Sequence, residues 1–205
     1  MIDFNTFDSE KIRYVYKDIE KGLHQAQKVR KLPFSREDIV QMLPSNLNMA
    51  EVGVWKGDFS DNLLKTIPKK LYLIDAWKNM FDSNNQTDEF DIIKKEVYDK
   101  FGSNDRVNII EGDSQESAEH LDDSSMDFIY IDASHRFPNV YEDIKMYATK
   151  IKSGGILMGH DWLRYPKIGF AVNYSVKKFL EGTDQFLFKG ITNEEKFASW
   201  IMVKK

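Results

Sequence analysis

The sequence predicts an α/β fold in which helices cover both faces of a parallel sheet. Two observations predict it. After Pro44, short apolar runs rich in β-prone residues alternate with longer stretches of helical periodicity. These runs are almost continuously hydrophobic, as expected of strands buried on both faces. With 205 residues, of which 41% are hydrophobic and 13% aromatic, the chain is long enough to form one large domain.

The first part of the chain is predicted to be helical. Apolar residues recur at helical spacing over Ser9–Gln25, which indicates an amphipathic helix. A short helix is expected to begin at Ser35–Asp38, where a hydroxyl and a later carboxylate can serve the unpaired amides of a first turn, and to end before Pro44. We assign residues 1–47 to a helical extension and 48–205 to the main domain. The extension could cap the substrate side or join protomers in a homo-oligomer.

The main domain is predicted to hold five strands in succession. They are Met49–Val54, Leu71–Ile74, Val107–Ile110, Phe128–Ile131 and Ile156–Met158. Amphipathic helices fit between them, at Asp58–Ile67, Thr87–Phe101 and Pro138–Lys150. The last two apolar runs, Phe186–Gly190 and Phe197–Val203, are too close together for a crossover helix and therefore predict an antiparallel hairpin at the sheet edge.

Composition and charge exclude several kinds of function. The chain has no cysteine, so it has no disulfide, no thiolate nucleophile and no zinc site built on sulfur. The formal net charge is −4 and the basic residues are scattered, so we expect no nucleic-acid partner. No apolar run approaches the ~20 residues that span a bilayer, and the N-terminus lacks the pattern of a signal peptide. We expect a soluble, cytoplasmic protein without a membrane partner.

An acidic residue stands within or just after each of the five predicted strands. These residues are Glu51, Asp75, Asp113, Asp132 and Asp161. Parallel strands end at one edge of a sheet, where open α/β folds bind ligands, so we expect the five carboxylates to converge there. Like charges in a partly dry crevice repel one another unless a cation is present. The edge therefore predicts a positively charged ligand, although any one of these acids could instead cap a helix.

The first strand leads into a turn with the spacing E-x-G-x-x-x-G, at Glu51–Gly57. Its glycines, Gly53 and Gly57, allow the backbone to approach a ligand and the next helix to pack closely. The spacing is neither the G-x-G-x-x-G turn of dinucleotide enzymes nor a P-loop. Asp75, 24 residues after Glu51, is placed to accept hydrogen bonds from ribose hydroxyls. The turn and this acid together favour a nucleoside ligand.

Five segments resemble the successive motifs of class I S-adenosylmethionine-dependent methyltransferases. They are Glu51–Gly57, Asp75 after LYLI, Glu111–Ser114, Phe128–His135 and Gly154–Asp161. The resemblance covers residues 48–182 and, more loosely, the closing hairpin. Within that superfamily, the sequences IDASH and GGILMGHD resemble the bacterial magnesium-dependent O-methyltransferases that act on macrolide and aminocoumarin sugars.

This resemblance implies a doubly wound, Rossmann-like sheet of seven strands in the order 3-2-1-4-5-7-6, with strand 7 antiparallel. It implies S-adenosylmethionine as cofactor and a hydroxyl of a small molecule or sugar as methyl acceptor. The cofactor-binding residues it implies are Glu51 near the methionine ammonium, Gly53 and Gly57 under the cofactor, Asp75 on the ribose, Asp113 and Ser114 beside the adenine, and Asp132. Trp55 or Trp77 could flank the nucleoside, although each such residue is more often part of the core than of a cofactor site.

The residues after the fourth and fifth strands are our candidates for the chemistry. Asp132 and Asp161 offer the oxygen ligands that Mg²⁺ prefers, and a bound metal would lower the pKa of an acceptor hydroxyl. The resembling family often has a second acid where this chain has His160, and imidazole suits Mn²⁺, Fe²⁺ or Zn²⁺ better. Either His160 contacts substrate or a ligand, or the metal differs, or there is none. His135 is our candidate general base, with a loop histidine as the alternative.

Other residues could serve the acceptor. Arg136, Arg164 and Tyr165 flank the same edge and could grip an anionic or polyhydroxyl substrate. The polar stretch Lys78–Gln86 is expected to be a mobile loop over the cofactor.

Three other functions stay open. A nicotinamide oxidoreductase shares the architecture but should carry three glycines in its first turn. A non-catalytic nucleoside-binding module would explain Glu51, Asp75 and Asp113 only. Nucleic-acid methylation is disfavoured by the acidic charge and by the lack of an aromatic-ended Asn/Asp-Pro-Pro motif.

Overall fold

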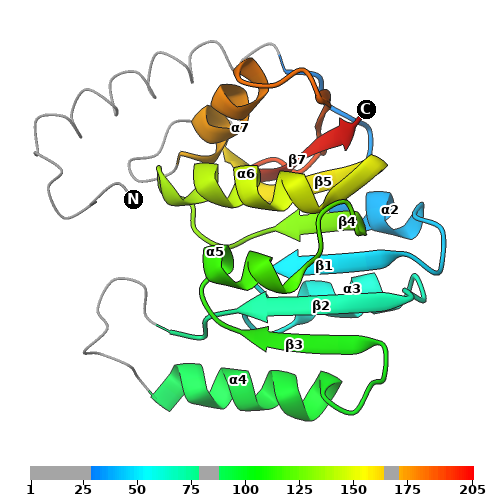
Figure 1. The fold of residues 1–205 in the computed structure, drawn as a ribbon, viewed down its shortest axis with the longest axis vertical. Helices are drawn as coiled ribbons and strands as arrows, with labels where there is room; N and C mark the ends of the chain where they lie inside the picture. Colours follow the sequence, from blue (N-terminus) through cyan, green and yellow to red (C-terminus); the bar gives the residue numbers. More distant parts are fainter. Residues whose placement is uncertain (1–28, 79–87, 164–170) are drawn as a thin grey trace, which may run out of the picture.

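The structure is a computed structural model that describes residues 29–78, 88–163 and 171–205. A seven-stranded sheet in the order β3-β2-β1-β4-β5-β7-β6 forms its centre (Figure 1). Strands β1 to β5 pair in parallel, and β7 is antiparallel to both of its neighbours, β5 and β6. The sheet order and the antiparallel seventh strand confirm the sequence-based prediction.

The strands extend over β1 Asn48–Val52, β2 Lys70–Asp75, β3 Val107–Glu111, β4 Met126–Ile131, β5 Ile151–Leu163, β6 Phe186–Ile191 and β7 Phe197–Lys204. The helices of the described residues are α2 Arg36–Gln41, α3 Asp58–Leu64, α4 Asp88–Phe101, α5 Ser114–Ser117, α6 Asn139–Lys150 and α7 Val172–Glu181, and a 3₁₀ turn, η3, spans Ala118–His120. Every strand and helix predicted within these residues is present, and apart from β5 their ends shift by only a few residues.

Hydrophobic cores lie on both faces of the sheet. Strand β4 shows this most simply, because its alternating side chains belong to different cores. Ile129 and Ile131 pack with residues of α6 and α7, whereas Phe128 and Tyr130 pack with residues of α2, α3 and α4. A strand buried on both faces has few polar positions along it, which is why the predicted strands are almost continuous apolar runs.

Helix α2 begins as its sequence predicts. The backbone N–H of Asp38 donates to Ser35 Oγ over 3.0 Å, and the backbone N–H of Ser35 donates to Asp38 Oδ2 over 2.9 Å. This reciprocal pair satisfies two amides that the first helical turn leaves unpaired.

Some elements differ from the prediction. Strand β5 has 13 residues, where the sequence indicated only Ile156–Met158, because glycine and polar residues before and after this run interrupt its apolar pattern. Helices α5 and α7 were not predicted. The first is only four residues long, too short for a helical period to show.

The segment before α2 is joined to the sheet. Lys31 forms a parallel bridge with Ile191 of β6, the N–H of Leu32 donates to the Ile191 carbonyl over 2.7 Å, and the N–H of Ile191 donates to the Arg30 carbonyl over 2.9 Å. The predicted helix Ser9–Gln25 lies outside the described residues. None of the helices in the described ranges combines the length and apolar character needed to cross a membrane.

Candidate active site

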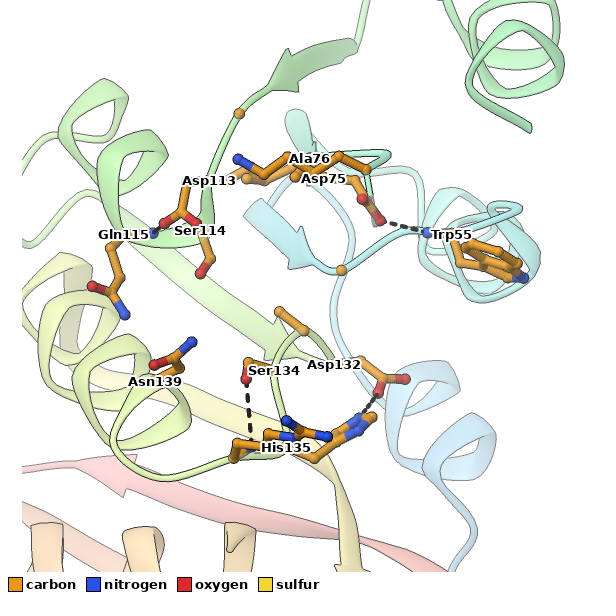
Figure 2. Close-up of a pocket in the computed structure, with 16 residues that line it drawn as sticks. Trp55, Asp75, Ala76, Asp113, Ser114, Gln115, Asp132, Ser134, His135 and Asn139 are labelled. Carbon is orange, nitrogen blue, oxygen red and sulfur yellow. Dashed lines mark hydrogen bonds and ion pairs between the residues drawn. The ribbon is translucent and has the colours of Figure 1, made fainter. Parts of the chain in front are cut away.

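A cavity of about 700 Å³ opens at the carboxyl ends of β1, β2, β3 and β4 (Figure 2). The loops after these strands and the start of α6 form its walls. Eight of the residues singled out in the sequence line it: Gly53, Trp55, Asp75, Asp113, Ser114, Asp132, His135 and Arg136. In Figure 2, Asp113, Ser114 and Gln115 lie at one end of the cavity, Trp55 lies at the other, and Asp132 and His135 lie opposite Asp75. The expected convergence of side chains at one edge is therefore present.

Gly53 lies where the loop after β1 meets the loop after β4. Its φ is +91°, and a Cβ atom at this position would lie 2.2 Å from the backbone oxygen of Asp132. The N–H of Gly53 donates to the Ile74 carbonyl over 2.8 Å, and the N–H of Asp132 donates to the Val52 carbonyl over 2.7 Å. Only glycine allows the two loops to pack this closely, so Gly53 shapes the floor of the cavity.

The Asp75 carboxylate holds the loop after β1 in place. Its Oδ2 accepts hydrogen bonds from the backbone N–H groups of Val54 and Trp55, each over 2.8 Å, and its Oδ1 accepts from that of Trp77 over 2.8 Å. A carboxylate has about four acceptor positions, so three amide donors leave room for one more. Asp75 can thus organise the loop and still accept a ligand hydroxyl.

The two tryptophans that could flank a nucleoside have different positions. Trp55 lines the cavity and is 45% exposed. Trp77 is 2% exposed and belongs to the core, and its Nε1 donates to the Trp55 carbonyl over 3.0 Å. Of the two, Trp55 is the one placed to contact a ligand, and Trp77 supports it.

Glu51 and Gly57, which we expected at the cofactor, do not line the cavity. Glu51 is 2% exposed and accepts a hydrogen bond from the Ser60 hydroxyl. Burial is the main cause that raises its pKa to about 8; the charges of Asp132 and Asp75 act in the same direction, and Ser60 opposes them. A Cβ atom on Gly57 would meet the ring of Phe101 at 2.5 Å, so this glycine serves the packing of α3 against α4.

Asp113 and Ser114 begin helix α5 at one end of the cavity. Asp113 caps the helix, since its Oδ1 accepts from the backbone N–H of Gln115 over 3.0 Å. The Ser114 hydroxyl donates to Asp143 over 2.7 Å, and the Tyr147 hydroxyl donates to the Ser114 carbonyl over 2.6 Å. Helix α6, which carries both partners, therefore fixes this end of the cavity.

The opposite part of the edge brings together Asp132, His135 and Asp161. Nε2 of His135 lies 2.5 Å from Asp161 Oδ2 and 3.7 Å from Asp132 Oδ1. One ligand atom from each of the three residues lies within 4.8 Å of the other two. Nδ1 of His160 lies 3.5 Å from Asp161 Oδ1 and 3.6 Å from Asp132 Oδ2. Four side chains from the ends of β4 and β5 thus face one another.

An irregularity in β5 produces this meeting. Gly159 pairs with Trp200 of β7 and Trp162 pairs with Ala198, so β5 holds one residue more than β7 over this stretch. Asp161 lies in it with φ of +58° and is only 6% exposed. Such a β-bulge breaks the alternation of side chains. Asp161 and its neighbour His160 therefore both face Asp132, although adjacent residues of a regular strand point to opposite faces.

The charges in this group are coupled. Burial opposes a charge on His135, but the attraction of Asp132 and Asp161 outweighs it and raises the pKa of His135 to about 9. Burial also opposes the charge of Asp161, yet His135 and His160 hold its pKa well below the usual range. Without a metal, protonated His135 supplies the positive charge that the two facing carboxylates require; a cation bound to these residues would replace that proton, because only a neutral imidazole can be a ligand.

The donor set of this group fits a divalent cation. Two carboxylates and one imidazole are ligands that Mn²⁺, Fe²⁺ or Zn²⁺ accept readily, and Mg²⁺ accepts the two carboxylates. The ligand atoms are close enough to reach one ion. His135, our candidate base, is the third member of this set, and His160, our candidate third ligand, lies beside the same two carboxylates.

The sheet order, the cavity at its carboxyl edge and the acidic rim define the class I S-adenosylmethionine-dependent methyltransferase fold. A family model described as a methyltransferase domain matches residues 50–162. The chain therefore belongs to this methyltransferase family. No match is found among curated proteins.

Solved structures with the same fold include two described as methyltransferases and one of a fibrillarin. A SAM dependent methyltransferase from Aquifex aeolicus is 17% identical with a TM-score of 0.58, over 97% of this chain and 100% of that one. A provisionally assigned O-methyltransferase from Klebsiella pneumoniae is 15% identical with a TM-score of 0.59, over 92% and 89%. Fibrillarin from Aeropyrum pernix, solved with natively bound S-adenosyl-L-methionine, is 10% identical with a TM-score of 0.57, over 78% and 67%.

Sequence reasoning missed part of the site. Gln115 and Asn139 line the cavity beside Ser114 but belong to no motif that we singled out. A polar residue in the first turn of a helix that follows a strand was the available signal. Arg136 lines the cavity as expected, and so does Lys78, the first residue of the predicted loop. The rest of that loop, Arg164 and Tyr165 lie outside the described residues.

Proposed function

We propose that this methyltransferase transfers a methyl group from S-adenosylmethionine to a hydroxyl of a small molecule, with a divalent cation at Asp132, His135 and Asp161. The observation that carries the proposal is the meeting of these three side chains at the edge of the cavity. The acidic net charge of −4 supports a small-molecule acceptor over a nucleic acid. A sugar-type hydroxyl is a weak nucleophile when neutral, so it is an acceptor that would benefit from a cation beside the methyl donor.

The cavity offers suitable partners for the methyl donor. Asp75 can accept from a ribose hydroxyl, and Ser114, Gln115 and Asn139 can contact the nucleobase. S-adenosylmethionine supplies an electrophilic methyl group on a positively charged sulfur. The carboxylates at the edge favour this charge, so the site attracts the charged donor more strongly than its neutral product.

The side chains at the other part of the edge act on the acceptor. Asp132, Asp161 and His135 would hold the cation, which lowers the pKa of a hydroxyl bound to it. His160 directs Nδ1 at both carboxylates. This pairing orients the ring and leaves Nε2 as the atom that accepts a proton. The hydroxyl oxygen forms its bond to the methyl carbon as the carbon–sulfur bond breaks, and the hydroxyl proton passes to His160.

Binding and turnover test the proposal. Calorimetry should show S-adenosylmethionine and S-adenosylhomocysteine binding to the purified protein, and neither NAD nor NADP. A panel of sugar and phenolic acceptors should then release S-adenosylhomocysteine when Mg²⁺ or Mn²⁺ is present. Absence of binding would refute the proposal. Binding without product release under any of these metal conditions would instead indicate a non-catalytic nucleoside-binding module.

A further inference from the structure

A buried carboxylate lies directly behind the nucleobase end of the cavity. Asp143, on α6, is 0% exposed and does not line the cavity. Its Oδ1 accepts the hydroxyl hydrogen of Ser114 over 2.7 Å, and Ser114 does line the cavity. One turn earlier on the same face of α6, Asn139 reaches the cavity itself.

The buried carboxylate of Asp143 has fewer hydrogen-bond donors than a purely structural role would require. Within the described part of the chain, its Oδ2 receives no hydrogen bond. Burial is the main cause that raises the pKa of Asp143 to about 7, and the nearby charge of Asp113 adds to it, while the Ser114 hydroxyl and the Gln115 side chain oppose both. An apolar residue would fill this place at a lower energetic cost, because an unpaired buried oxygen is unfavourable.

The effect of Asp143 on Ser114 follows from hydrogen-bonding rules. A hydroxyl has one hydrogen to donate and two lone pairs to accept with. In the structure Oδ1 accepts the hydroxyl hydrogen of Ser114, and an ionised carboxylate can only accept. The single hydroxyl hydrogen of Ser114 is then occupied, and towards the cavity the hydroxyl can only accept.

We propose that Asp143 is a positioning residue that makes Ser114 an obligate acceptor, and that this selects a 6-amino purine over a 6-oxo purine in the cavity. The exocyclic amino group of adenine donates hydrogen bonds, whereas the carbonyl of hypoxanthine would place an acceptor against an acceptor. A site whose polar group is left unpaired discriminates strongly against the analogue. The inference rests on the proposed function, because it requires an adenosine cofactor in this cavity.

The structure provides a matched control. Tyr147, one turn after Asp143 on α6, donates its hydroxyl to the backbone carbonyl of Ser114 over 2.6 Å. It anchors the same residue from the same helix without touching the Ser114 hydroxyl. Tyr147→Phe therefore removes an anchor of comparable length and leaves the direction of the Ser114 hydroxyl unchanged.

The test compares two ligands by calorimetry. They are S-adenosylhomocysteine and S-inosylhomocysteine, in which a carbonyl replaces the 6-amino group. We expect the wild-type protein and Tyr147→Phe to prefer the adenosine compound by about tenfold or more. Asp143→Asn keeps the shape of the side chain but can donate as well as accept, so the preference should fall to about threefold or less. Ser114→Ala removes the hydroxyl and should do the same, and the double variant should show no further change.

The outcomes separate the two claims. Failure of the wild-type protein to bind either ligand refutes the proposed function. Binding of S-adenosylhomocysteine with an equal affinity for the 6-oxo analogue, or an unchanged preference in Ser114→Ala, overturns the role of Asp143 while leaving the methyltransferase proposal intact. If Asp143→Asn does not fold, Ser114→Ala against Tyr147→Phe decides the matter, since Ser114 is at the surface of the cavity. A preference lost equally in Tyr147→Phe would also overturn the inference.

Discussion

Nε2 of His135 lies 2.5 Å from Oδ2 of Asp161, although 25 residues lie between them, His135 follows β4 and Asp161 lies within β5. The contact joins the loop after β4 to the irregular segment of β5. With Asp132, it forms the part of the site where methyl transfer is proposed, and it sets the first prediction.

Replacing Asp161 by Asn should separate catalysis from cofactor binding. The variant removes a carboxylate that would hold the cation, yet Asp161 is not among the residues lining the main cavity. We expect turnover to fall by about 100-fold or more and the Kd for S-adenosylhomocysteine to change by less than about threefold. Asp123→Asn, on the exposed loop before β4, is the matched control and should change neither quantity. A comparable loss of affinity and turnover in Asp161→Asn would contradict the assignment.

Removing metal should lower both activity and stability. After treatment with a chelator, addition of Mn²⁺ or Mg²⁺ should restore turnover and raise the melting temperature, because a cation bound only by the folded protein stabilises it. His135→Ala should lose most of this increase, since one ligand atom is removed. His120→Ala, which changes an exposed histidine in η3, should keep it. Equal thermal shifts in both variants would place the cation elsewhere.

Glu51 should make the protein less stable as pH rises. Its pKa is raised from 4.5 to about 8 in the folded protein, chiefly by burial, so the folded chain holds a proton that the unfolded chain loses. The resulting stabilisation is complete below about pH 4.5 and is lost as pH rises towards 8. At about 1.4 kcal/mol per pKa unit, the difference amounts to a few kcal/mol.

Melting temperatures of the wild type and Glu51→Gln, measured from pH 5 to pH 8.5 without ligand, test this prediction. The glutamine stays neutral, so the variant should gain several degrees relative to the wild type across the range. The comparison also cancels the contribution of Asp143, whose raised pKa acts in the same direction in both proteins. If the melting temperatures of the two proteins differed by the same amount at every pH, Glu51 would not have a raised pKa.

Gly53→Ala should destabilise the protein more than the same change at another glycine with positive φ. At Gly53 the new methyl group would lie 2.2 Å from the Asp132 backbone oxygen, whereas at Gly154, with φ of +78°, nothing lies within 4 Å. Gly154→Ala should therefore cost only the backbone strain of about 1–2 kcal/mol. Gly53→Ala should cost clearly more in chemical denaturation and should also weaken cofactor binding, because the cavity floor must shift. Equal effects would mean that the loop relaxes freely.

Much of the fold was predictable because its signals are local. Five continuous apolar runs separated by amphipathic helices specify a parallel sheet, and the acids at their ends marked the edge where the cavity lies. The sheet order came from family resemblance, since periodicity along a chain does not reveal which strands are neighbours. The positions of Asp75 and Asp132 at that edge follow from strand direction alone.

The details of the site depend on contacts that sequence spacing does not encode. Glu51 belongs to the correct strand, but its side chain turns into the interior against Ser60, because neighbouring residues of a strand face opposite sides. The different places of His135 and His160 depend on the extra residue in β5, which has no pattern of its own in the sequence. Asp143 read simply as a polar position on an amphipathic helix, and only the structure shows that it points inward to Ser114.

The extra residue between Gly159 and Trp162 has a consequence for how such a site can arise. With one residue fewer, β5 would pair with β7 without interruption, and its successive side chains would alternate between the two faces of the sheet. The edge of the cavity would then carry the carboxylate of Asp132, which follows the neighbouring strand β4, but not that of Asp161. A catalytic centre of this kind can therefore be gained or erased by a change of length, while every amino acid around it stays the same.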